Sequence, residues 1–170
     1  MSNIDLVNAF IAPAQWIWEK EIGISLDMKN ARAVGNTTTT EDVTAVIAFK
    51  GDVEGSVLYG FSRNTARTMI DCMMDEEIQN WDDVAGSALG EMAQIITTHA
   101  TSGLALANYK CQFSVPMIIE TIGQPLNVIS DQIQVSFVSE IGPLNIRFAL
   151  NDTTVVKDDD LLDWLRMRYK

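Results

Sequence analysis

A line of four polar residues runs through an otherwise apolar stretch of the sequence. Ser87, Glu91, Gln94 and Thr98 are separated by three or four positions, so on a helix they fall within an arc of roughly 60°. A carboxylate can hold an ammonium group, and an amide can both accept from and donate to one water molecule. Glu91 could therefore hold a lysine while Gln94 fixes a water in line with a phosphorus atom, which is the positioning that phosphoryl transfer requires.

The plainer interpretation of the same line is the solvated side of an ordinary amphipathic helix. In both interpretations an opposite, apolar side faces the core, and it consists of Ala88, Leu89, Met92, Ile95, Ile96 and His99. This placement predicts that His99 is hydrogen-bonded and partly buried, and not catalytic. Gly90, Ala93 and Thr97 lie beside the polar line, and their small size leaves room for another backbone to approach.

Other kinds of reactive site find little support in the residue pattern. A single histidine and two distant cysteines, Cys72 and Cys111, make no zinc-type cluster. No arrangement of serine, cysteine and histidine indicates nucleophilic catalysis, and no glycine loop is of the phosphate-binding kind. We expect the two cysteines to be reduced thiols, because they are too few for a disulfide framework.

The composition limits which partners the protein can bind and where in the cell it is expected. The chain has 170 residues, 47% of them apolar, which suits one globular domain with a sizeable core. The net charge of −11 argues against nucleic acid and against anionic membrane, because both require a basic surface. No apolar run approaches the roughly 20 residues that span a bilayer. Residues 1–23 lack the positive start of a signal peptide, so we expect a cytoplasmic protein.

Several secondary-structure elements are expected to position the polar line. The first half predicts a helix over residues 3–23, kinked or restarted at Pro13, then a strand over 24–34 and a polar loop over 36–42. Two β-rich runs around GDVEG predict a hairpin over 43–62. An amphipathic helix follows over 62–74, with Ser62 as its N-cap.

The second half repeats this order of elements. The helix that carries the polar line is predicted from Trp81 to Thr101, ending near Gly103. A strand over 110–121 contains Pro116, which belongs at a sheet edge or a bulge. A second hairpin covers 133–150. Residues 158–170 are typical of a short helix, docked on the domain or bound to a partner.

These elements predict an α+β fold, a mostly antiparallel sheet packed with helices. The spacing from Gly55 to Phe61 equals that from Gly142 to Phe148, which indicates a weak internal duplication with a repeat of about 80 residues. The repeated order of elements is helix, strand, hairpin and helix. We expect one domain over residues 1–152 and a tail over 153–170.

Given the polar line and the predicted elements around it, the sequence resembles the CheX/CheC/FliY family of chemotaxis phosphatases. That family carries an acidic residue or serine, then three residues, Glu, two residues, Asn, and a proline about 22 positions later. Ser87, Glu91, Gln94 and Pro116 have this spacing. NAFI at 8–11, the GDVEGSVLYGFS hairpin and the VPMII strand extend the resemblance over residues 3–150.

The resemblance implies removal of phosphate from the phospho-aspartate of a CheY-like response regulator. Glu91 would pair with the regulator's lysine and Gln94 would orient the attacking water. Ser87 and Thr98 would contact the partner, and Pro116 would be structural. The resemblance implies no cofactor on this chain, because the Mg²⁺ belongs to the regulator.

Two departures keep other hypotheses open. Gln94 replaces the family's asparagine and is longer by one methylene, which could move the water by about 1 Å and lower the rate about a hundredfold. Glutamine is used by the unrelated helical phosphatase CheZ, however. Thr98 replaces a glycine. The alternatives are a non-catalytic CheX-like binding module and a plain scaffold domain.

Only one of the two predicted repeats carries the motif. A shift of 80 residues places Ile11 and Ala14 where Glu91 and Gln94 stand. The sequence is therefore most similar to single-site CheX-like members, which the resemblance implies form homodimers through their sheets.

Overall fold

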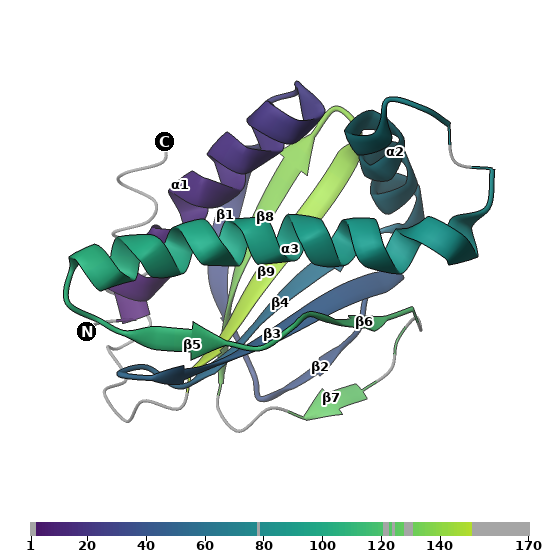
Figure 1. Ribbon diagram of the computed structural model, residues 1–170. Helices are drawn as coiled ribbons and strands as arrows, with labels where there is room; N and C mark the ends of the chain where they lie inside the picture. Colours follow the sequence, from purple (N-terminus) through teal and green to yellow (C-terminus); the bar gives the residue numbers. More distant parts are fainter. Residues whose placement is uncertain (1–2, 78, 121–122, 124, 128–130, 151–170) are drawn as a thin grey trace.

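Three helices cover one face of an antiparallel sheet (Figure 1). This is the computed structural model of the chain, and it describes residues 3–77, 79–120, 123, 125–127 and 131–150. The helices are α1 (Asn3–Ile22), α2 (Arg63–Met74) and α3 (Trp81–Leu106). The predicted α+β fold with a mostly antiparallel sheet is confirmed.

The main sheet has seven strands in the order β1-β8-β9-β4-β3-β5, and β6 also pairs with β3. Their bounds are β1 (Asp27–Val34), β3 (Val43–Gly51), β4 (Gly55–Phe61), β5 (Cys111–Phe113), β6 (Met117–Ile119), β8 (Gln132–Ser139) and β9 (Gly142–Leu150). The two predicted hairpins are β3–β4 and β8–β9, and they meet where β4 pairs with β9 at the centre.

Alternation along the strands divides the sheet into an inner and an outer face. The inner residues lie under the helices and are buried, as in Val43, Ala45, Ile47 and Phe49 of β3, Val57, Tyr59 and Phe61 of β4, and Leu144, Ile146 and Phe148 of β9. Phe10 of α1 meets Phe148 edge-on, with ring centroids 5.1 Å apart. The core thus fixes the helix layer against one face of the sheet.

The first two helices differ from expectation at one point. α1 runs from Asn3 to Ile22 without restarting at Pro13, so that part of the prediction was wrong. The buried residues before and after the proline, Ile11 and Ala14, keep both parts of the helix on the same core. The cap of α2 is confirmed, because Ser62 Oγ accepts a hydrogen bond of 3.1 Å from the backbone N–H of Thr65.

The third helix is longer than predicted. It continues through Gly103 to Leu106, which gives it 26 residues. The left-handed residue that closes it is Asn108, with φ of 66°, and the N–H of Tyr109 donates to the carbonyl of Leu104. Asparagine tolerates this conformation better than other residues with a Cβ, and a glycine inside a helix weakens it without ending it.

Two segments were assigned wrongly or too coarsely from the sequence. Within the predicted loop 36–42, Thr37–Thr39 forms β2, which pairs with β7 (Pro125–Asn127) as a separate two-stranded sheet. The predicted strand 110–121 is divided into β5 and β6, both paired with β3. Pro116 lies in the break between them, the interrupted edge position that a proline requires.

Several other expectations are settled only in part. Cys72 and Cys111 are unpaired. Within the described residues, every helix falls short of the length and apolarity that crossing a bilayer needs. The tail predicted for 153–170, including its helix at 158–170, lies outside the described residues. The internal duplication stays a prediction.

Candidate functional site

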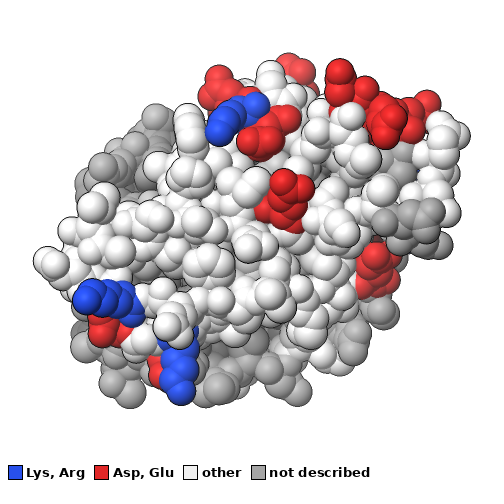
Figure 2. All heavy atoms as spheres, viewed as in Figure 1, with Lys and Arg blue, Asp and Glu red and all other residues white. Residues whose placement is uncertain are grey.

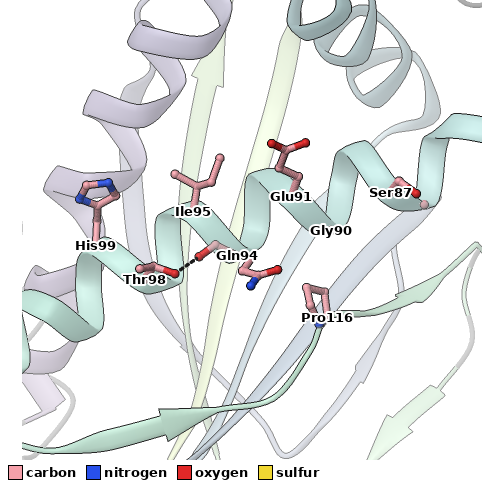
Figure 3. A pocket seen from close by; sticks show the side chains of 9 residues that line it. Ser87, Gly90, Glu91, Gln94, Ile95, Thr98, His99 and Pro116 are labelled. Carbon is pink, nitrogen blue, oxygen red and sulfur yellow. Dashed lines mark hydrogen bonds between the residues drawn. The ribbon is translucent and has the colours of Figure 1, made fainter.

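The polar line of α3 borders a cavity of about 520 Å³ on the side of the helix that faces away from the sheet (Figure 3). Its lining residues are Gly86, Ser87, Gly90, Glu91, Gln94, Ile95, Thr98, His99 and Pro116. All except Pro116 belong to one helix, so a single rigid element sets their spacing. The structure therefore brings together all five residues that the sequence singled out.

Glu91 and Gln94 are both exposed, as a functional pair must be. In the described part of the chain, neither side chain has a hydrogen-bond or ion-pair partner. Figure 3 shows their head groups diverging, with the Gln94 amide turned towards Pro116 and the Glu91 carboxylate turned the other way. Such a pair can engage two different groups of a partner at once.

Hydroxyl groups in the second half of α3 are turned back onto the helix. Thr98 Oγ1 donates to the carbonyl of Gln94 at 2.7 Å, and Ser102 Oγ donates to the carbonyl of Thr98 at 2.8 Å. These donors are therefore occupied, although their oxygens can still accept. The Gln94 amide, in contrast, keeps its donor and its acceptor free of the other described residues, which suits the handling of a water molecule.

Gly90 explains the place of Pro116 in the site. A Cβ built on Gly90 would lie 3.6 Å from Pro116 Cβ and 3.7 Å from Pro116 Cγ. The group that packs against Gly90 is thus the Pro116 side chain from the chain's own β5–β6 break. Ala93 and Thr97, the other small residues beside the polar line, are buried against the core.

The prediction that His99 is hydrogen-bonded and partly buried was wrong. Its side chain is exposed and lines the cavity, and no described residue makes a hydrogen bond with it. Its ring meets the ring of Trp16 edge-on, with centroids 5.1 Å apart and an interplanar angle of 74°. His99 sits at the border between the polar and apolar arcs of α3, and the aromatic contact turns it outward. Ile95, at the same border, is half-buried.

Sequence reasoning missed a polar cluster on the outer face of the sheet. Glu41 Oε1 accepts from Asn145 Nδ2 at 2.6 Å and from an Arg147 guanidinium nitrogen at 3.2 Å. Arg147 Nε also donates to Gln134 Oε1 at 2.8 Å. Burial raises the pKa of Glu41, and the bond from Asn145 and the charge of Arg147 oppose that rise.

That cluster could not be found from spacing, because Glu41 and Arg147 are 106 positions apart. It lies on the face opposite the cavity, so it does not belong to the candidate site. Among the described residues, no group of histidine, cysteine and carboxylate side chains could hold a metal ion.

Comparisons with known proteins identify a family and structures with the same fold. The family profile described as "Chemotaxis phosphatase CheX" matches residues 43–139. The CheY-P phosphatase CheX of Thermotoga maritima is 30% identical over 91 residues, which is 53% of this chain and 59% of that relative. The match therefore spans less than two thirds of the relative's length.

Solved structures share the fold at lower identity. The chemotaxis protein CheX from Desulfovibrio desulfuricans is 21% identical, with a TM-score of 0.79 over 86% of this chain and 99% of the other. CheX in a CheX–CheY–BeF₃–Mg²⁺ complex from Borrelia burgdorferi is 18% identical, with a TM-score of 0.64 over 88% and 100%.

The family profile and the shared helix-covered antiparallel sheet place the chain in the CheX/CheC/FliY class of protein, and the resemblance seen in the sequence is confirmed. Because the family profile covers more than half of the chain, the chain belongs to the CheX family of chemotaxis phosphatases.

Proposed function

We propose that the protein removes the phosphoryl group from the phospho-aspartate of a CheY-like response regulator. The observation that carries the proposal is the exposed, unpartnered pair of Glu91 and Gln94 on the outer side of α3. The relative from Thermotoga maritima, a CheY-P phosphatase, supports it. So does the complex of a structurally similar CheX with CheY.

In this proposal the chain supplies positioning and the regulator supplies the electrophile. The Glu91 carboxylate forms a charge-assisted hydrogen bond with a lysine of the regulator and fixes the orientation of docking. The Gln94 amide enters the regulator's site, donates to or accepts from one water, and aims a lone pair of that water at phosphorus. A P–O bond to water forms as the bond to the aspartate oxygen breaks.

Ser87 and Thr98 complete the proposed contact on either side of the pair. Both are exposed and both line the cavity. The Mg²⁺ in this reaction belongs to the regulator, and we propose no cofactor on this chain. We place the protein in the cytoplasm, where response regulators work.

The test measures loss of phosphate from each phosphorylated receiver encoded in the same genome, after the phosphodonor is removed. We expect Gln94→Ala to lower the rate about 10²-fold or more with a modest loss of affinity, because an uncharged amide acts mainly at the reacting centre. Glu91→Ala should weaken binding as well as rate. Met74→Ala, at an exposed position of α2, is the control. An unchanged rate in Gln94→Ala would refute the mechanism.

A second candidate function is a non-catalytic module that binds a receiver. Two features favour it: the longer amide arm of Gln94, and the Thr98 side chain, which adds bulk where the family has glycine. The same assay separates the two functions, because a binding module would capture phosphorylated receivers without speeding the loss of phosphate.

A further inference from the structure

The α3 surface around the proposed site is almost free of charge. From Val84 to Tyr109 the sequence contains one Asp, Glu, Lys or Arg, which is Glu91, although the whole chain has 23 acidic and 12 basic residues. The exposed positions of α3 in this range are Ser87, Glu91, Gln94, Thr98, His99, Ser102, Gly103, Ala105 and Leu106. Figure 2 shows a band of uncharged surface across this face, with one acidic group in it and the other charges around its margins.

Some exposed apolar side chains lie on α3 or in contact with it. Among the described residues, five large hydrophobic side chains are exposed, and four of them are Trp16, Leu106, Val115 and Met117. Leu106 ends α3. Val115 and Met117 flank Pro116 in sequence, but Met117 pairs with Val46 and therefore points to the outer face of the sheet, away from α3. The fifth is Met74 of α2. Depletion of charge together with an exposed tryptophan is the composition of an interface core.

Trp16 is the largest of these groups and is held in place without being buried. It is 52% exposed, whereas its neighbours Ile17 and Trp18 are fully buried. Its ring packs edge-on against His99, and Lys20 Nζ lies 5.1 Å from its centroid. A ring fixed in this way loses little conformational freedom on binding, which is why tryptophan is frequent among the residues that dominate interfaces.

The charge pattern selects the kind of partner. The chain carries −11, so most surfaces of it would repel an anionic partner. A phosphorylated receiver presents a phosphoryl group beside carboxylates, and each added acid opposite that group would raise the repulsion. On this face a single carboxylate is surrounded by uncharged residues, so the other acidic residues of the chain lie farther from such a partner.

We infer that the docking surface for the phosphorylated receiver extends beyond Glu91 and Gln94, along the uncharged side of α3 to His99 and Trp16, with Trp16 as an apolar anchor. This inference rests on the proposed function. It adds that the face selects an anionic partner by excluding acids and that affinity depends on an aromatic residue of α1.

The first test of the inference measures binding of the full chain to receivers loaded with Mg²⁺ and beryllium fluoride. Trp16→Ala should raise Kd about tenfold or more while the dephosphorylation rate at saturating protein stays unchanged, because the ring is remote from the reacting atoms. Met74→Ala, at an exposed apolar position on α2, should leave Kd unchanged. Equal Kd values for Trp16→Ala and the unmodified protein would overturn the anchor.

The second test probes the charge of the face at Ser102, which is exposed one turn beyond Thr98. Ser102→Asp should slow association several-fold at low ionic strength, and the difference should shrink in high salt because the added repulsion is screened. Ser102→Asn, of the same size without charge, should associate normally. A salt-independent loss in both variants would indicate a steric effect and would overturn the charge argument.

The outcomes separate this inference from the proposed function. If the unmodified protein binds receivers but never dephosphorylates them, the proposed activity fails and the docking surface is judged by Trp16→Ala alone. If activity is present and Trp16→Ala behaves like the unmodified protein, only the inference fails. If Trp16→Ala changes the mass in solution and not receiver binding, a second copy of the chain covers Trp16 and the inference is wrong. Binding to no receiver overturns both.

Discussion

The hydroxyl oxygen of Tyr59 lies 2.8 Å from Oγ1 of Thr97, between the centre of the sheet and the back of α3, with both residues buried. Thr97 Oγ1 already donates to the carbonyl of Ala93 at 2.8 Å, so Tyr59 must be the donor in this pair. Burial raises the pKa of Tyr59, which keeps the phenol protonated and able to donate. This bond ties the sheet to the helix segment that carries Gln94.

From that bond we expect unequal effects of two substitutions. Tyr59→Phe should lower the free energy of unfolding by about 1 kcal/mol, because Thr97 keeps its bond to Ala93. Thr97→Val should lower it more, because the buried Tyr59 hydroxyl then has no acceptor there. Urea denaturation of both variants measures the difference. A larger loss in Tyr59→Phe would mean that the donor assignment is wrong.

Gln94→Asn tests the length of the amide arm. If the extra methylene misplaces the water, the shorter residue should raise the dephosphorylation rate, by up to about a hundredfold. Single-turnover loss of phosphate from a receiver that the unmodified protein accepts is the measurement, with receiver affinity as the control for folding and docking. A slower Gln94→Asn would show that the surface is adapted to glutamine.

Glu41→Gln should change how stability depends on pH. The folded protein raises the pKa of Glu41 above its ordinary value of 4.5, chiefly by burial. Folding therefore favours the protonated acid, and this contribution to stability is present below pH 4.5 and is lost as pH rises through the folded pKa. An amide at this position cannot ionise, so the stability of the variant relative to the unmodified protein should increase from pH 4.5 upwards. Thermal unfolding of both proteins from pH 4.5 upwards measures this difference in stability. A difference that stays constant or falls with rising pH would contradict the prediction.

Two glycine-to-alanine substitutions should have opposite signs. Gly90→Ala places a methyl group at ordinary contact distance, 3.6 Å, from Pro116 Cβ inside a helix, so we expect stabilisation of about 0.5–1 kcal/mol. Gly60→Ala places its methyl group on the Glu41 carboxylate, which is bonded to Asn145 and Arg147. We expect it to destabilise by about 1–3 kcal/mol. Denaturant midpoints measured side by side provide the comparison, and loss of stability in Gly90→Ala would contradict the predicted fit.

Assembly gives the last prediction. The likeness to single-site CheX members and the apolar hairpins lead us to expect a homodimer formed through the sheets. Light scattering at tens of micromolar should give twice the chain mass of 18.8 kDa. A mass of 18.8 kDa would exclude the dimer under those conditions.

Local signals in the sequence were enough to predict most of the framework. The GDVEG turn, the Ser62 cap and the three- and four-residue spacing of Glu91 and Gln94 each depend on neighbouring residues, and the structure contains the hairpin, the cap and the exposed pair. The position of a helix residue around its axis follows from counting alone. For that reason the polar residues that line the cavity were predictable.

The features that escaped prediction depend on partners distant in sequence. Thr37–Thr39 is polar and resembles a loop until β7 pairs with it. His99 was assigned to the core by its angle on α3, but Trp16 of another helix turns it outward. The Glu41–Arg147 contact joins segments that no local pattern connects. These three features depend on packing between elements, which local residue propensities do not encode.

The strand order has a consequence for how the chain acquires its structure. Among the described strands, β1, made early, pairs only with β8. β5 and β6, made after the first hairpin, complete the side of the sheet begun by β3. Roughly a hundred more residues must be synthesised after β1 before its partner β8 exists. Such a large sequence separation between paired strands is typical of slow folding. Neither half can finish its own sheet. The nascent first half therefore exposes unpaired strand edges until the second half emerges. The sheet face against which α3 packs is complete only when all the strands have paired.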